Sequence, residues 1–131
     1  MKNFFFLLIP VSVFFSCNLN LGIDEAEKAA ELFHRDLKNN EFDRIIDHQI
    51  SSEALQMTTS EEWLEIFELL NTNGGIKEVR KKMGFKSSNT NGVHTVRLEY
   101  VYTLNDGTEM TEILVLLKEK ERFKLKSLEW N

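Results

Sequence analysis

Cysteine and proline are almost absent from this chain of 131 residues, which contains one of each, Cys17 and Pro10. A single cysteine excludes an intramolecular disulfide, even in a compartment where disulfides form. Any folded domain downstream of these two residues is therefore held together by its apolar core. Long apolar runs are also absent after Cys17: the longest, Ile113–Leu117, is much shorter than the roughly 20 residues of a membrane-spanning helix.

Motifs for metal, nucleotide or covalent chemistry are missing as well. The three histidines, His34, His48 and His94, do not have the spacing of an HxH or HxxxH metal motif, and there is no CxxC pair. The chain has no GxSxG, Walker or GxGxxG loop, and Gly74-Gly75 is better explained as the end of a helix. We therefore predict neither a metal nor a cofactor.

Positive charge is in the minority, because 16 basic residues face 21 acidic ones and the formal net charge is −5. A net acidic chain is a poor candidate for binding nucleic acid or for electrostatic adhesion to anionic lipid. The one basic cluster, Arg80-Lys81-Lys82, could contact a phosphate or a lipid headgroup. Its acidic neighbour Glu78 favours a solvated strand face instead.

The first seventeen residues are typical of a secretory signal. Lys2 supplies a positive charge, and an almost continuous apolar run covers residues 4–15. The run ends in Phe14-Phe15-Ser16-Cys17, which resembles the bacterial lipoprotein signal, with Phe14 in place of the usual leucine. The resemblance implies cleavage before Cys17 and acylation of that cysteine. The alternative is an ordinary cleaved signal followed by an incidental cysteine.

Acylation of Cys17 would attach the protein to a membrane surface, because two or more acyl chains anchor stably where one binds only marginally. We expect a membrane-anchored lipoprotein of the cell envelope that contacts membrane lipid through its N-terminus. Asn18 stands where an Asp can direct sorting, so the outer membrane is favoured if the cell has two. The predicted divisions are a signal peptide at 1–16, the lipidated cysteine and a linker at 17–23, and one folded domain at 24–131.

The first half of the folded domain has the periodicity of helices. A capping-box pair, Asp24 and Glu27, predicts the start of a helix whose apolar face recurs to about residue 40. A second short helix is predicted over 41–48. A third helix lies between its cap Thr59 and the stop at Gly74-Gly75.

The second half alternates apolar and polar residues. The alternation is clearest over 94–104, which predicts a strand with one solvated face. Asn105-Asp106-Gly107 marks a tight turn into a strand at 108–118. The last strand covers 122–130, and a bulge near Lys126-Ser127 would restore its apolar residues to one face.

A weaker strand is predicted from Gly75 onward, where Val79, Met83 and Phe85 have charged residues between them. Together these elements predict an α+β domain in which N-terminal helices pack on a curved antiparallel sheet of three to four strands.

Five local features of the chain fit one known arrangement. They are the Ala29-Ala30-x-x-Phe33 helix, the Glu62-Trp63-Leu64 helix start, Gly84, the strand at 93–104 and the closing Trp130. In this order they resemble the nuclear transport factor 2-like or cystatin-like superfold, and in detail a family of uncharacterised bacterial envelope domains. The resemblance implies a cone in which the sheet wraps the first helix. It implies no activity, because this superfold hosts isomerases, dehydratases, transport adaptors and non-catalytic binders.

The cone between sheet and helices is the usual pocket of this superfold. Tyr100 and Tyr102 share the inward face of their strand, and polar residues of the helices would close the cone. Those residues are His34, Asp36, Asp47 and His48. A tyrosine beside a buried carboxylate could stabilise an enolate, and Trp63 could line a ligand cleft.

Packing is the stronger interpretation of these aromatic residues, because paired tyrosines on an alternating strand usually form core. We therefore predict a possible pocket of Tyr100, Tyr102, Trp63 and His34, and we assign no catalytic residue.

Three functions remain open, and we favour the first. It is a non-catalytic module that binds a small apolar ligand or a protein partner. The second is a small pocket enzyme of the isomerase or dehydratase type. The third is an assembly subunit that forms a homodimer through its sheet. An inward acid near Tyr100 or Tyr102 in a roomy pocket would favour the enzyme, and an exposed apolar sheet face would favour assembly.

Overall fold

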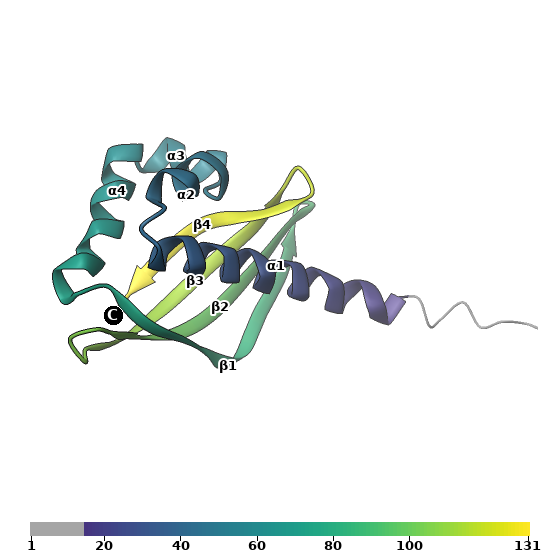
Figure 1. The fold of residues 1–131 in the computed structure, drawn as a ribbon. Helices are drawn as coiled ribbons and strands as arrows, with labels where there is room; N and C mark the ends of the chain where they lie inside the picture. Colours follow the sequence, from purple (N-terminus) through teal and green to yellow (C-terminus); the bar gives the residue numbers. More distant parts are fainter. Residues whose placement is uncertain (1–14) are drawn as a thin grey trace, which may run out of the picture.

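The computed structural model describes the backbone of residues 15–131 and the side chains from residue 22 onward. Residues 1–14 and the side chain of Cys17 lie outside this description, and with them most of the predicted signal peptide. Within the described part, helices precede strands along the chain (Figure 1). The elements are α1 (Phe15–Lys38), α2 (Phe42–His48), α3 (Ser52–Met57), α4 (Ser60–Glu68), the 3₁₀ helix η2 (Leu69–Asn73), β1 (Ile76–Thr90), β2 (Val93–Leu104), β3 (Glu109–Glu119) and β4 (Arg122–Trp130).

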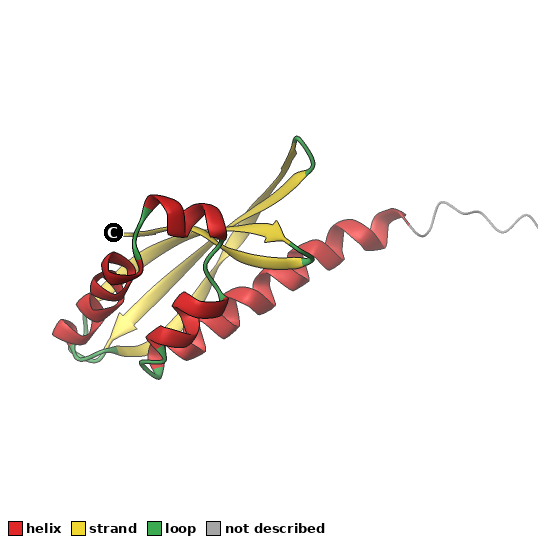
Figure 2. Cartoon of the chain, turned by 90° about the horizontal axis from the view of Figure 1, so that it is seen from above, coloured by secondary structure: helices red, strands yellow, loops and turns green. Residues whose placement is uncertain are grey.

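The four strands form one antiparallel sheet in the order β1-β2-β3-β4, so each strand pairs with its neighbour in sequence. The sheet is twisted and curved, and α1 runs diagonally across its concave face (Figures 1 and 2). The shorter helices lie at the end of the sheet away from the N-terminus. The predicted α+β architecture, with N-terminal helices packed on a curved antiparallel sheet, is confirmed. No helix in the described part is both long and apolar enough to cross a membrane.

The first helix begins earlier than predicted. It starts at Phe15, so residues 18–23, predicted as a linker, are helical. Asp24 and Glu27 lie inside the helix, and the predicted capping box at its start is wrong. The packing of this end gives a physical reason for the longer helix. Gly22 lies so close to β2 that a Cβ there would be 2.8 Å from His94 Cε1.

The second and third predicted helices are confirmed as α2 and α4, and the sequence analysis missed α3 between them. The Thr59 side chain accepts a hydrogen bond from the Glu62 backbone N–H, as predicted for the start of α4. Ser51 caps α3 by accepting a hydrogen bond from the Ala54 backbone N–H at 3.1 Å. The helix was missed because a serine before a short polar segment fits a loop as well as a helix cap.

The edge of the sheet at β4 is covered by the segment between α2 and α3. The Ser51 backbone N–H donates to the Leu125 carbonyl at 2.9 Å, and the Leu125 N–H donates to the Gln49 carbonyl at 2.7 Å. The predicted bulge in β4 is confirmed, because Val115 pairs with Ser127 while Leu116 pairs with Leu125. The opposite edge, β1, has no such cover among the described residues.

The predicted alternation of β2 is confirmed, but that of β1 is wrong in its middle. Val96, Leu98, Tyr100, Tyr102 and Leu104 of β2 are all buried. In β1 the register shifts between Lys81 and Phe85, which pair with Tyr100 and Leu98. Three residues, 82–84, lie opposite the single residue Glu99 and form a bulge in which Met83 is fully exposed. Gly84 has φ +102°, a backbone conformation that side-chain-bearing residues rarely adopt, so the bulge is built where the chain has a glycine.

Replacing Gly74 by alanine is expected to lower the free energy of unfolding by about 2 kcal/mol, against about 1 kcal/mol for Gly92→Ala. Both glycines have positive φ, +83° and +78°. A Cβ at Gly74 would also lie 3.2 Å from Asn105 Cβ, whereas at Gly92 it would meet nothing within 4 Å. Urea denaturation of both variants measures the difference. Equal losses would contradict a steric role for the contact with Asn105.

Candidate functional site

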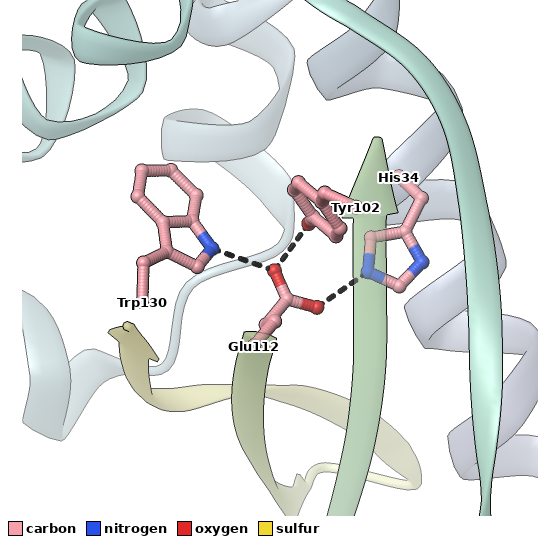
Figure 3. A network of polar contacts seen from close by, with 4 residues as sticks. All are labelled: His34, Tyr102, Glu112 and Trp130. Carbon is pink, nitrogen blue, oxygen red and sulfur yellow. Dashed lines mark hydrogen bonds and ion pairs between the residues drawn. The ribbon is translucent and has the colours of Figure 1, made fainter. Parts of the chain in front are cut away.

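A buried carboxylate, Glu112 of β3, lies at the centre of a polar network under α1 (Figure 3). Its Oε2 accepts hydrogen bonds from the Tyr102 hydroxyl and from Trp130 Nε1, the latter at 2.9 Å. Its Oε1 lies 2.6 Å from His34 Nε2. The Glu112 side chain is 0% exposed and that of His34 is 8% exposed. We refer to these four residues as the Glu112 network.

The register of the sheet brings the strand members together. Glu112 pairs with Tyr100 on β2 and with Trp130 on β4, and Tyr102 is the next residue on the same face of β2. Residues in such direct and diagonal cross-strand positions lie close enough for their side chains to touch. His34 comes from α1, which crosses above them. The network therefore joins three strands and the long helix at one point.

The hydrogen bonds decide where the proton of His34 lies. A carboxylate only accepts hydrogen bonds, and a phenol and an indole N–H both donate to Glu112. With two other donors already on this carboxylate, His34 donates from Nε2, and its second ring nitrogen, Nδ1, does not contact Glu112. Figure 3 shows this second ring nitrogen pointing away from Glu112, on the side of β1.

Tyr102 belongs to this network and Tyr100 lies beside it, and the pKa of each hydroxyl is raised. Burial, and then the charge of Glu112, raises the pKa of Tyr102 well above its ordinary value of 10.0. Burial, and then the charge of Glu27, also raises the pKa of Tyr100. A buried phenolate next to a carboxylate is disfavoured by desolvation and by repulsion alike. Both side chains are therefore neutral donors at physiological pH.

Stability is expected to fall steeply above pH 10, by up to about 2.7 kcal/mol per pH unit for the two tyrosines together. In the unfolded chain they lose their protons near pH 10, while in the folded chain their raised pKa values keep them protonated, so alkali favours unfolding. Phenolate absorbance reports only Tyr100 and Tyr102, since the chain has two tyrosines. It should rise together with the loss of the circular dichroism signal, and Tyr100→Phe should halve the slope. Phenolate appearing in a still folded protein would contradict the buried placement.

The exposed side of His34 lines a recess of about 280 Å³ at the surface, which we call the His34 recess. Its walls come from α1, β1 and β2. They are Glu27, Glu31, His34, Val79, Lys81 and Tyr100. The Lys81 ammonium forms an ion pair with the Glu27 carboxylate across its rim. The recess thus holds an oriented imidazole, a phenol and a neutralised charge pair.

Three of the four predicted pocket residues are brought together. The His34 ring lies 4.4 Å from the Tyr100 ring and 5.5 Å from the Tyr102 ring, centre to centre. Trp63 is not part of this group. It packs against Phe67 with ring centres 5.7 Å apart, and its buried Nε1 has no hydrogen-bond partner among the described residues. Trp130, which the sequence analysis named only as the closing residue of the last strand, is the tryptophan that donates to Glu112.

The other polar residues expected to close the cone lie elsewhere. Asp36 is buried at the opposite side of α1, where its Oδ2 accepts from Gln49 Nε2 at 2.6 Å. Asp47 and His48 are exposed. Sequence reasoning missed Glu112 altogether. The signal that could have found it is parity, because Met110, Glu112 and Leu114 fall on the same face of β3 and only Glu112 is charged.

A second and larger depression follows α1 on its other side, where β4 and the end of α2 meet it. It measures about 460 Å³, and we call it the α1–β4 groove. Its apolar lining residues are Ala29, Leu32, Phe33, Leu116, Phe123 and Leu125, and its polar ones are Glu25, Lys28, Arg44, His48, Gln49, Glu121, Arg122 and Lys124. Most of the apolar residues are buried, while Leu32 is 38% exposed, so they form the bottom of the groove and the charged residues its rim.

Among residues with described side chains, no group of three or more histidine, cysteine, aspartate or glutamate residues could hold a metal ion. Cys17 is placed in α1 by its backbone, two helical turns before Glu25 of the groove. Function has to be inferred from these features of the chain itself. No model of a known protein family matches the chain, and no characterised protein is similar to it in sequence.

Proposed function

We propose that this protein is a membrane-anchored lipoprotein of the bacterial cell envelope whose domain binds a small apolar ligand in the α1–β4 groove. The observation that carries the proposal is the groove itself. A volume of about 460 Å³ with an apolar bottom and a polar rim is within the range of small-molecule sites, roughly 300–1,000 Å³. Its walls come from α1, from the paired strands β3 and β4, and from the end of α2.

The position of the groove fits a protein held at a membrane. Helices rise 1.5 Å per residue, so Glu25 at the rim of the groove lies about 12 Å along α1 from Cys17. An acylated Cys17 would hold this end of the domain near the lipid surface. An apolar molecule leaving the membrane would then have a short path to the groove.

The test is native mass spectrometry of the full chain purified gently from its own host. We expect added mass, beyond the polypeptide and its acyl chains, that is lost in Leu32→Gln. Leu32 is partly exposed at the groove, so this change should not disturb the core. Leu69→Gln is the matched control, since Leu69 is 59% exposed and lies outside the groove. An adduct that persists in Leu32→Gln would contradict this site, and a clean dimer without added mass would favour an assembly role.

Replacing Cys17 by serine is expected to release the protein from the membrane fraction, because a hydroxyl has no sulfur with which to form the thioether that links the lipid to a lipoprotein cysteine. Fractionation followed by immunoblotting measures the change, and incorporation of labelled palmitate should disappear with it. Asn20→Ser, which keeps the cysteine, is the control. If the amount of the Cys17→Ser variant in the membrane fraction is unchanged, the prediction that Cys17 carries the membrane anchor is wrong.

A pocket enzyme is the second candidate, and the Glu112 network is the observation that favours it. His34 and Tyr100 line one recess, and the hydrogen bond to Glu112 fixes the orientation of the imidazole. An oriented base next to a neutral phenol is suited to moving a proton beside a carbonyl group. The test follows deuterium exchange of small cyclic ketones by NMR. Exchange above the solvent rate that is abolished in His34→Gln would establish this activity. If no exchange above the solvent rate is seen, the network has a structural role only.

A further inference from the structure

The rim of the α1–β4 groove carries an excess of positive charge. Four of its residues are lysine or arginine and two are glutamate. They are Lys28, Arg44, Arg122 and Lys124, against Glu25 and Glu121. The whole chain has the opposite balance, with 21 acidic and 16 basic residues. This groove is therefore positive on a protein that is negative overall, which attracts anions to it.

Two of the four cations have no carboxylate partner within the described side chains. Lys124 Nζ lies 3.8 Å from Glu119 Oε1, and Arg44 Nη1 lies 3.6 Å from Asp36 Oδ1. Lys28 and Arg122 form no ion pair with a described residue. Both are exposed, one on α1 and the other on β4. They line the groove from different walls.

The free cations lie toward one end of the groove. Glu25 Oε2 is 3.8 Å from Lys118 Nζ, so the end of β3 lies beside the first groove-lining turn of α1. Arg122 follows directly after the turn from β3 to β4, and Lys28 is one helical turn beyond Glu25. This is the end of the groove nearer to Cys17. The segment 48–49 lines the groove from α2, next to the buried aromatic core.

We propose that the ligand of the α1–β4 groove is a free single-chain anionic amphiphile. Its head lies beside Lys28 and Arg122, and its tail covers Leu32, Phe33 and Leu125. This inference rests on the proposed function and names the chemical class of its ligand. The buried bottom of the groove removes methylene groups from water, while the unpaired guanidinium and ammonium groups bind the anionic head.

The probes are decanoate, decanol and decylamine, which differ in the head and share the tail, each used below its critical micelle concentration or, for decanol, below its solubility limit. Binding is measured by calorimetry on the full chain carrying Cys17→Ser, so that no detergent competes. Every residue of the described core lies at Ala26 or later, and this change touches none of them. We expect decanoate to bind about tenfold more tightly than decanol, and decylamine to bind more weakly than both.

The tail is tested by length. Each added methylene that enters the groove should tighten binding about fourfold, the equivalent of roughly 0.8 kcal/mol. The series from octanoate to dodecanoate should show this increment until the groove is filled. Leu32→Gln should weaken decanoate and decanol alike, and Leu69→Gln should weaken neither.

The head is tested by charge. Arg122→Gln and Lys28→Gln should each weaken decanoate severalfold and leave decanol unchanged. Arg80→Gln on β1 and Lys126→Gln on β4 remove the same charges outside the groove and should change nothing. All four residues are exposed, so the variants should keep the parent melting temperature.

The outcomes separate this inference from the proposed function. Equal affinities for decanoate and decanol, both reduced by Leu32→Gln, would overturn the anionic class and leave an apolar ligand in the groove. A loss of affinity in Arg80→Gln as large as that in Arg122→Gln would also overturn it, because general charge would then explain the preference. No binding of any probe would overturn both.

Discussion

Replacing Glu112 by alanine is expected to lower the free energy of unfolding by about 3–5 kcal/mol, because each polar group that loses its only hydrogen-bond partner in the protein interior costs about 1–3 kcal/mol. The change leaves the Tyr102 hydroxyl, Trp130 Nε1 and His34 Nε2 without their common acceptor. The donors of Tyr102 and His34 are buried, and that of Trp130 is partly buried, so each loses a hydrogen bond that water replaces poorly. Urea denaturation followed by tryptophan fluorescence measures the loss, since Trp130 reports directly on this site.

The matched control for this variant is Glu129→Ala, a glutamate on the neighbouring strand that is exposed and pairs with Ile113. It should change stability by less than about 0.5 kcal/mol, as is usual for surface substitutions. Glu112→Gln keeps one acceptor oxygen but brings an amide that cannot accept, so it should lose an intermediate amount. A Glu112→Ala loss as small as that of Glu129→Ala would mean that the network contributes nothing to folding.

Replacing Phe67 by alanine is expected to cost about 3–5 kcal/mol as well, for a different reason. Phe67 is 0% exposed, and its ring lies 5.9 Å from that of Phe33 and 5.8 Å from that of Phe42. It therefore connects α4 to α1 and α2, and its removal leaves a cavity between three helices. Thermal and urea unfolding measure the cost.

Two further variants interpret the Phe67 result. Leu69→Ala removes an apolar side chain that is 59% exposed two residues away and should be almost neutral. Phe67→Leu keeps much of the volume and should recover most of the loss. If Phe67→Leu is as unstable as Phe67→Ala, the geometry of the aromatic contacts matters more than the filled volume.

The sheet was the most predictable part of the fold, because its residues alternate with period two and one face is solvated. That pattern identified β2, β3 and β4, and the change of parity within β4 located the bulge near Lys126. The bulge in β1 was not predictable in the same way. Met83 is apolar, so its residue type predicts a buried side chain. Only the pairing with β2 shows that it faces water.

The candidate site was predictable in part. The positions of Tyr100 and Tyr102 follow from strand parity, and His34 follows from its place one residue beyond the core residue Phe33. Glu112 was missed because an acidic side chain in a strand is assigned to water by its type, although its parity places it inside. The choice between Trp63 and Trp130 depends on which of them meets an acceptor, and that is set by tertiary contacts.

The bulge at residues 82–84 has a consequence for how copies of this protein meet. An uncovered edge strand offers its free backbone groups to any other strand, and β1 is such an edge over fifteen residues. Its register shift between Lys81 and Phe85 divides that edge into two shorter stretches, with lysines on either side of the break. A second chain cannot therefore extend the sheet along the whole of β1 without interruption, which protects copies of this protein against pairing edge to edge.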